Sequence, residues 1–226
     1  MCIRDRQFPD ILQNLPQLEQ NASGFGVFTV RPDVDGVFRR VPLVMKVQGS
    51  VRLGLAPELL RVATGGDAFA IRSNEAGIEG VVVARQLVKT DSDGSVWPHF
   101  SPSQRARYVS ATDLLNDRLP AGRLTGHLLL VGTSAIGLED FRATPLGSRM
   151  AGVEIHAQVL ENILTQTLLY RPNYAIGAEL ALTVLLGLIA IALTPALGAR
   201  WAIIGSGILL AGVAYGAWWA FDVHQL

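Results

Sequence analysis

Charge is almost absent from the C-terminal quarter of this sequence. Between residues 172 and 226 the only charged side chains are Glu179, Arg200 and Asp222, whereas the preceding residues carry the other 35 charges. Two runs without charge, 180–199 and 201–221, each provide the roughly 20 apolar residues that a helix needs to cross a bilayer. The sequence therefore predicts a polar domain followed by two transmembrane helices, which we place at residues 175–199 and 201–221.

The two apolar runs are separated by only a short LGAR segment, which predicts a tight antiparallel hairpin. Gly212 and Gly216 have the spacing that allows close helix packing in membranes. Four aromatic residues lie at the expected membrane interfaces; they are Tyr170, Tyr174, Trp218 and Trp219. Arg171 and Arg200 balance one another, so charge alone does not orient the hairpin. A pair of helices buried in a larger soluble protein is the alternative interpretation.

Composition excludes several classes of function. The chain has 19 Lys and Arg against 19 Asp and Glu, so its net charge gives no basis for nucleic-acid binding. One cysteine, Cys2, excludes an intramolecular disulfide and a multi-cysteine zinc site. The four histidines have no metal-ligand spacing. We therefore predict no metal, no cofactor and no nucleic-acid partner.

The first six residues, MCIRDR, back-translate to ATG-TGT-ATA-AGA-GAC-AGR, which matches the mosaic end of a transposase-based sequencing adapter. Our hypothesis is that residues 1–6 are an assembly artefact, in which case Cys2 is not native. A raw sequencing read that crossed this junction in frame with different codons would contradict it. Because the sequence also stops directly after the second apolar run, we expect the chain to be the middle of a longer protein.

Residues 7–170 alternate strand and helix patterns, which predicts an α/β domain consisting of a sheet with flanking helices. The expected strands are 24–30, 37–47, 68–71, 80–84 and 128–131, and the expected helices are 53–64, 110–115 and 153–169. The segment LLLV at 128–131 is wholly apolar, as in a strand buried on both faces.

Two Asp-x-Asp-Gly segments, at 33–36 and 91–94, predict tight hairpin turns. An EF-hand calcium loop needs a glutamate six residues after the glycine, where this chain has Pro42 and Phe100. On an extended strand Arg39 and Arg40 would point to opposite faces, so we expect only one of them to reach a carboxylate in the core.

The loop 132–140 follows the predicted buried strand, where free backbone N–H groups can bind a small ligand. A nucleophile elbow would need glycine two residues after Ser134, and a phosphate loop would need lysine after Gly137; both are missing. Asp140 and His156 still follow in α/β-hydrolase order, so a membrane-anchored serine hydrolase using Ser134, Asp140 and His156 is one alternative. We otherwise expect His156 to be held by a hydrogen bond near a helix start.

We place a candidate ligand-binding site in this loop and the polar residues that follow it. Its members are Gly132, Thr133, Ser134, Asp140, Thr144, Glu154 and His156.

Six motifs occur in a characteristic order before the membrane runs: PDVDGVFRRVPL (32–43), LAPELL (55–60), LLLVGTSA (128–135), GLED (137–140), TP (144–145) and GVEIHA (152–157). Together they resemble the CHASE type 2 domain, the extracellular sensory domain of bacterial receptor cyclases, histidine kinases and serine/threonine kinases. The resemblance covers most of residues 25–170. It implies a structural role for the first motif, namely Asp33, Asp35, Gly36, Arg39, Arg40 and Pro42.

The resemblance implies that residues 7–170 are the C-terminal part of such a domain and lie outside the cytoplasmic membrane, with Arg200 in the cytoplasm and Asp222 outside. It implies a full-length receptor with a further span and an adenylate or guanylate cyclase or a kinase as output. We expect a homodimer formed through the sensory and transmembrane regions, contact with membrane lipid, and an extracellular signal that the sequence does not identify. A structural or partner-binding membrane protein without an output domain is the remaining alternative.

Overall fold

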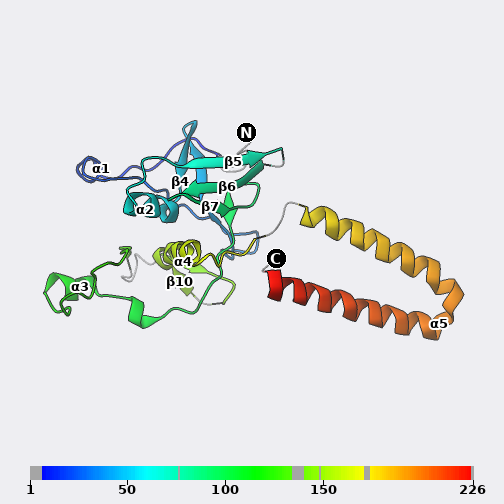
Figure 1. Cartoon of the computed structure of the whole chain (residues 1–226). Coiled ribbons are helices and arrows are strands. Elements are labelled where there is room, and N and C mark those ends of the chain that lie inside the picture. The colour runs from blue at the N-terminus through cyan, green and yellow to red at the C-terminus, as the bar shows by residue number, and fades with distance from the viewer. Residues whose placement is uncertain (1–6, 76, 134–139, 148, 171–173, 225–226) are drawn as a thin grey trace. The chain divides into compact units, whose positions relative to one another are not determined.

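The computed structural model describes residues 7–75, 77–133, 140–147, 149–170 and 174–224 (Figure 1). The chain divides into two compact units, Met1–Leu168 and Leu169–Leu226. The first unit mixes strands and helices, as the sequence predicts. Within the described residues its strands form four small sheets, however, and not the single sheet that we expected.

Two three-stranded sheets make up most of the strand content of the first unit. One has the order β1-β3-β4, in which β3 and β4 are antiparallel and β1 is parallel to β3. The other is the antiparallel sheet β5-β6-β7. These strands are β1 (Gln7–Phe8), β3 (Val44–Val47), β4 (Ser50–Leu53), β5 (Ala70–Asn74), β6 (Gly77–Val83) and β7 (Gln86–Lys89).

Two antiparallel pairs complete the strands of this unit. They join β2 (Val41–Pro42) to β8 (Ser95–Val96), and β9 (Phe141–Ala143) to β10 (Arg149–Ala151). The helical elements are α1 (Pro16–Glu19), α2 (Leu55–Ala63), the 3₁₀ turn η1 (Arg105–Arg107), α3 (Ala111–Leu115) and α4 (Gly152–Thr165).

The helix predicted at 53–64 forms as α2, and its end follows the glycine pair that the sequence provides. Gly65 has a φ of 65°, a conformation that glycine adopts without strain. The N–H groups of Gly65 and Gly66 donate to the carbonyls of Val62 and Arg61 at 3.0 and 2.9 Å. These bonds satisfy carbonyl groups that the end of the helix leaves free.

Packing of α4 against α2 and the sheets builds the main hydrophobic core. Ile155, Val159 and Ile163 lie on one face of α4, here called the apolar stripe, and are almost completely buried. Leu164 lies off this stripe, with 53% of its surface exposed. The helix ends at Thr165, earlier than predicted, because Gln166 adopts a left-handed conformation (φ 58°).

Two predicted strands do not form. Residues 24–30 make a single parallel bridge, between Val27 and Gly54. Residues 128–131 form no strand, and Leu129 and Val131 are 52% and 94% exposed. An apolar run becomes a buried strand only when neighbouring strands pair with its backbone, and no described strand pairs with this segment.

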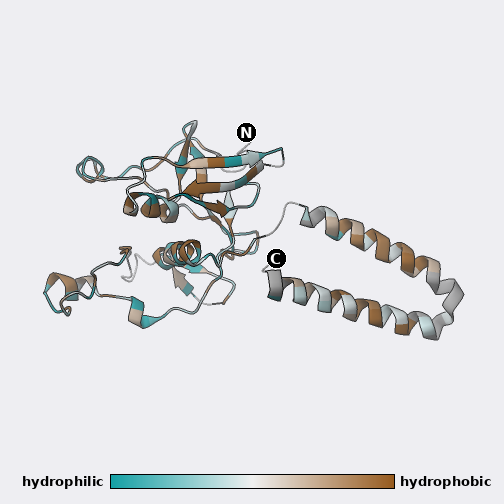
Figure 2. Cartoon of the chain, viewed as in Figure 1, coloured by the Kyte–Doolittle hydropathy of each residue, from teal (hydrophilic) through white to brown (hydrophobic). Residues whose placement is uncertain are grey.

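The second unit consists of α5 (Ala175–His224), in which two helices meet at Gly198, whose φ and ψ are 71° and 162°. Residues Ile203–Ala220 are long and apolar enough to cross a membrane, whereas the apolar stretch before the bend, Gly177–Ala192, is shorter. Hydrophobic residues occur along both arms (Figure 2). Most of their described large apolar side chains are exposed, so they have no protein partner in a single chain.

We predict that Ile155→Ala lowers the free energy of unfolding by about 2–5 kcal/mol, because it leaves a cavity in a closely packed core. Thermal and denaturant unfolding of the detergent-solubilised chain measures the change. Leu164→Ala on the same helix is the control and should change stability by no more than about 0.5 kcal/mol. Equal effects of the two substitutions would contradict the packing described.

Candidate functional site

The first Asp-x-Asp-Gly motif forms the predicted tight turn. The N–H of Gly36 donates to the carbonyl of Asp33, and the N–H of Asp33 donates to the carbonyl of Val37, both at 2.9 Å. The Asp35 carboxylate accepts the N–H of Val37 at 3.1 Å. Gly36 has a φ of 81°, which explains a glycine at this position.

Arg39 and Arg40 both reach this turn. The guanidinium of Arg39 donates to both carboxylate oxygens of Asp35, at 2.9 and 2.7 Å, and to Asp33 at 3.3 Å. Arg40 Nε donates to Asp33 at 3.2 Å. Our expectation that the two arginines point to opposite faces was wrong, because they precede β2 and do not lie on a strand.

These contacts change the acidity of both aspartates. The hydrogen bonds from Arg39 are the main reason why the pKa of Asp35 falls to about 2. Burial raises the pKa of Asp33, but its hydrogen bonds to Arg40 and Arg39 outweigh burial, and the net pKa is lowered. Both carboxylates are therefore ionised at neutral pH and remain paired with the arginines.

Arg40 also connects the first turn to the second. Its guanidinium lies 5.5 Å from the centre of the Trp97 ring, and the Trp97 indole donates to the Asp91 carboxylate at 2.7 Å. In the second turn, Ser95 donates its N–H to Asp93 at 3.0 Å, and Ser95 pairs with Pro42 between β8 and β2. These contacts of the motif thus lie within the domain and fix its loops.

A second group of predicted residues meets at the start of α4. Asp140 accepts the N–H of Gly152 at 2.7 Å through its carbonyl, and its carboxylate pairs with Arg142. A Cβ added to Gly152 would lie 2.1 Å from this carboxylate, and one added to Gly132 would lie 2.5 Å from the Val153 side chain. Glycine at these two positions allows both segments to approach the helix closely.

His156 lies on the next turn of α4 and is only 5% exposed. Its Nε2 is 3.1 Å from the carbonyl of Phe28, which confirms the predicted hydrogen bond near a helix start. Nδ1 is buried and has no hydrogen-bond partner within the described part of the chain. Burial lowers the pKa of His156, although the Phe28 carbonyl and Asp140 oppose the shift. The ring is therefore neutral, with the proton on Nε2.

The other predicted site residues do not join this group. Thr144 directly follows β9 and is buried, and its hydroxyl has no hydrogen-bond partner among the described residues. Glu154 instead accepts hydrogen bonds from Ser103, at 2.7 Å, and from Tyr108. Thr133 is exposed, and Ser134 lies outside the described residues.

The geometry does not support a hydrolase triad. In such a triad, the histidine Nε2 must face the serine while the carboxylate holds Nδ1. Here Nε2 is bound to the Phe28 carbonyl, and the Asp140 carboxylate is paired with Arg142. The described residues also contain no group of three or more His, Cys, Asp or Glu side chains arranged to hold a metal ion.

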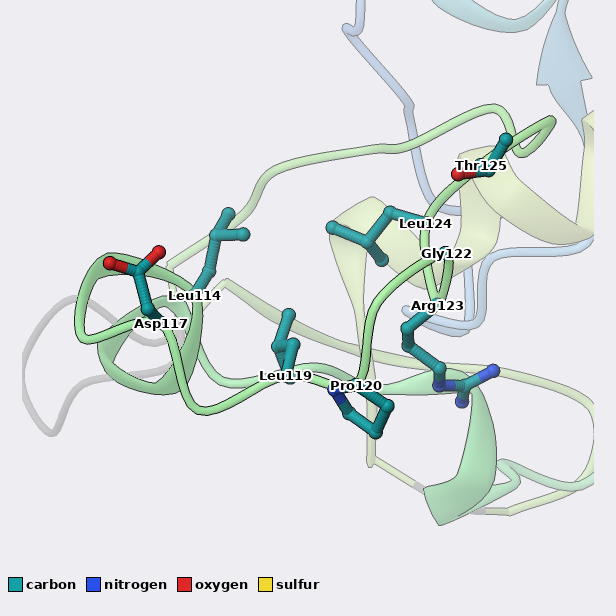
Figure 3. Close-up of a pocket in the computed structure, with 8 residues that line it drawn as sticks. All are labelled: Leu114, Asp117, Leu119, Pro120, Gly122, Arg123, Leu124 and Thr125. Carbon is teal, nitrogen blue, oxygen red and sulfur yellow. The ribbon is translucent and has the colours of Figure 1, made fainter.

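One open pocket, with a volume of about 450 Å³, lies at α3 and the segment that follows it (Figure 3). Leu114, Leu119 and Leu124 line it, and Figure 3 shows the Arg123 side chain extending away from them. Arg123 donates to the carbonyl of Ala106 at 2.7 Å. The pocket contains none of the residues that the sequence predicted for a ligand site.

Sequence reasoning also missed three polar residues of α4, namely Gln158, Glu161 and Asn162, which hold the segment 99–108. Gln158 exchanges two hydrogen bonds with the backbone of Ser101, at 3.0 and 2.9 Å. Glu154, Gln158 and Asn162 are spaced four residues apart on a face next to the apolar stripe, about 100° around the helix. That spacing was visible in the sequence, but their partner lies more than 50 residues away.

The family model described as the CHASE2 domain matches residues 3–194 of this chain. No curated protein and no solved structure shows significant similarity to it. Because the family match covers most of the sequence, the chain belongs to the CHASE2 family. CHASE2 is an extracellular sensory domain of signalling receptors, and it is not catalytic.

We predict that stability falls as the pH drops below about 6.5, the ordinary pKa of histidine. The folded-state pKa of His156 is lowered, so in this range the unfolded chain binds a proton that the folded chain does not. The melting temperature measured against pH should show this decline down to the lowered pKa. His156→Gln should remove the decline, and His127→Gln, at an exposed position, should leave it intact. An unchanged profile in His156→Gln would contradict the prediction.

Proposed function

We propose that this chain is the extracytoplasmic input and transmembrane region of a bacterial signalling receptor. The observation that carries the proposal is the succession of a CHASE2 domain and an apolar helix. In the full-length protein, we expect the output to be an adenylate or guanylate cyclase or a protein kinase.

We propose that α5 crosses the cytoplasmic membrane twice, as helices at 175–199 and 201–221. The bend at Gly198 and the exposed apolar side chains of both arms support this arrangement, since lipid would cover those side chains. Residues 7–170 then lie outside, Arg200 in the cytoplasm and Asp222 outside. Gly212 and Gly216 face open space, which is compatible with a homodimer that also packs through α5.

We propose that α4 passes the signal to the membrane. Its apolar stripe is fixed in the core, and only residues 166–174 separate its last residue, Thr165, from the first residue of α5. A ligand shifts such a helix when it binds one conformation of the domain more tightly than another conformation in which the helix is placed differently. The proposed input site is at the start of α4, where Gly132, Asp140 and His156 meet.

The topology predicts different labelling of two single cysteines in a Cys2→Ser background. In spheroplasts, a membrane-impermeant maleimide should modify Ser50→Cys, at an exposed position, and should modify Arg200→Cys only after permeabilisation. The reagent does not cross the lipid bilayer, so it reaches only the cysteine that lies outside until the membrane is permeabilised. Labelling of both cysteines from outside would refute the two spans, and the reversed pattern would refute the orientation.

The coupling predicts that a flexible Gly-Ser insertion after Leu169 uncouples the receptor. We expect the stimulus-dependent change in cyclase or kinase output of the full-length protein to fall by about fivefold or more, the lower end of typical coupling between sites. The same insertion after Gly49, in the exposed turn between β3 and β4, is the control. Unchanged output from the insertion after Leu169 would contradict transmission through α4.

A further inference from the structure

Residues 99–108, here called the strap, run along the polar face of α4. Three contacts repeat regularly: Asn162 accepts the N–H of His99 at 2.6 Å, Gln158 binds the backbone of Ser101, and Glu154 accepts the hydroxyl of Ser103 at 2.7 Å. Each step of two residues toward the C-terminus of the strap corresponds to a step of four residues toward the N-terminus of α4. Residues 99–103 of the strap are therefore extended and antiparallel to α4, and the 3₁₀ turn Arg105–Arg107 follows them.

The two spacings match for a physical reason. Four residues of an α-helix rise by about 6 Å, and two residues of an extended chain advance by about 6.5 Å. Side chains four apart on the helix can therefore reach every second residue of the strap without distortion. Glu154, Gln158 and Asn162, here called the polar ladder, hold the strap by side-chain contacts, and the strap belongs to no described sheet.

The two ends of the strap are held with different strength. Near its start, Phe100 lies in the hydrophobic core, and Gln158 and Asn162 are almost fully buried. Near its end, Arg107 pairs with Glu161 at 2.6 Å, and both side chains are about half exposed. Water and salt weaken an exposed ion pair. Residues 103–108 are thus the part of the strap that can leave the helix at low cost.

The final turn of α4 connects the strap to the exit of the helix. The carbonyl of Asn162 accepts the N–H groups of Gln166 and Thr167, while its side chain holds His99. The carbonyl of Glu161 accepts the hydroxyl of Thr165 at 2.8 Å, while its carboxylate holds Arg107. The residues that bind the strap therefore also close the end of the helix.

We propose that the strap is a releasable latch: bound to the polar ladder and Glu161 it fixes the last turn of α4, and its release from residue 103 onward frees that turn. The latch deepens the proposed function, on which its signalling role rests. It gives the sensory domain two discrete states, strap bound and strap released, that a signal can favour unequally.

Arg107→Glu tests the latch in the full chain reconstituted in lipid nanodiscs, with hydrogen exchange as the readout. Repulsion from Glu161 should speed amide exchange in residues 103–108 by about tenfold or more, and exchange at Gln166 and Thr167 should rise with it, while β6 remains protected. The charge-swapped double variant Arg107→Glu, Glu161→Arg should restore both regions. Arg105→Glu, at an exposed position in the same 3₁₀ turn, is the matched control.

Three results would overturn the latch. Unchanged exchange in 103–108 would show that the ion pair does not hold the strap. Faster exchange there without a change at Gln166 and Thr167 would show that the strap does not control the helix end. Loosening of β6 as well would show that the strap is an integral part of the core. The readout needs no stimulus or output domain, so it is independent of the insertion after Leu169, which tests the proposed function.

Discussion

Burial of one apolar stripe on α4 holds the sensory domain together. Ile155, Val159 and Ile163 enter a core that also contains residues of α2 and of the β-sheets. Because this face is fixed by packing, the remaining freedom of the helix depends on its polar face and its two ends. Close contacts at Gly152 fix the first end, and Asn162 and Gln166 form the other.

Charged side chains arrange the loops that surround this core. Asp33 binds Arg39 and Arg40, and Arg40 stacks near Trp97, which in turn binds Asp91. This chain of contacts joins two turns that lie nearly 60 residues apart. Trp97 lies two residues before the first residue of the strap, so the family motif and the polar face of α4 belong to one connected structure.

Part of the candidate site was predictable from local sequence. The Asp-Gly turns require only residues close in the chain. The place of His156 near a helix start is also local, but its hydrogen-bond acceptor, the Phe28 carbonyl, is 128 residues away and was not predictable. The pairing of both arginines with Asp33 was not predictable, because it depends on the loop that leads into β2. Glu154 and His156 are two residues apart and therefore do not share a face of the helix. The partners of Glu154, Ser103 and Tyr108, were not predictable, because they lie more than 40 residues away in sequence.

The sequence by itself determined the division into a polar domain and an apolar C-terminal region, the helices α2 and α4, and the family, because run length, periodicity and motif order are local properties. Only the tertiary structure decided that residues 128–131 remain unpaired, that the strands form four small sheets, and that the strap lies on α4. These features depend on partners distant in sequence. A pattern shows that a residue needs a partner, but the fold decides which partner it receives.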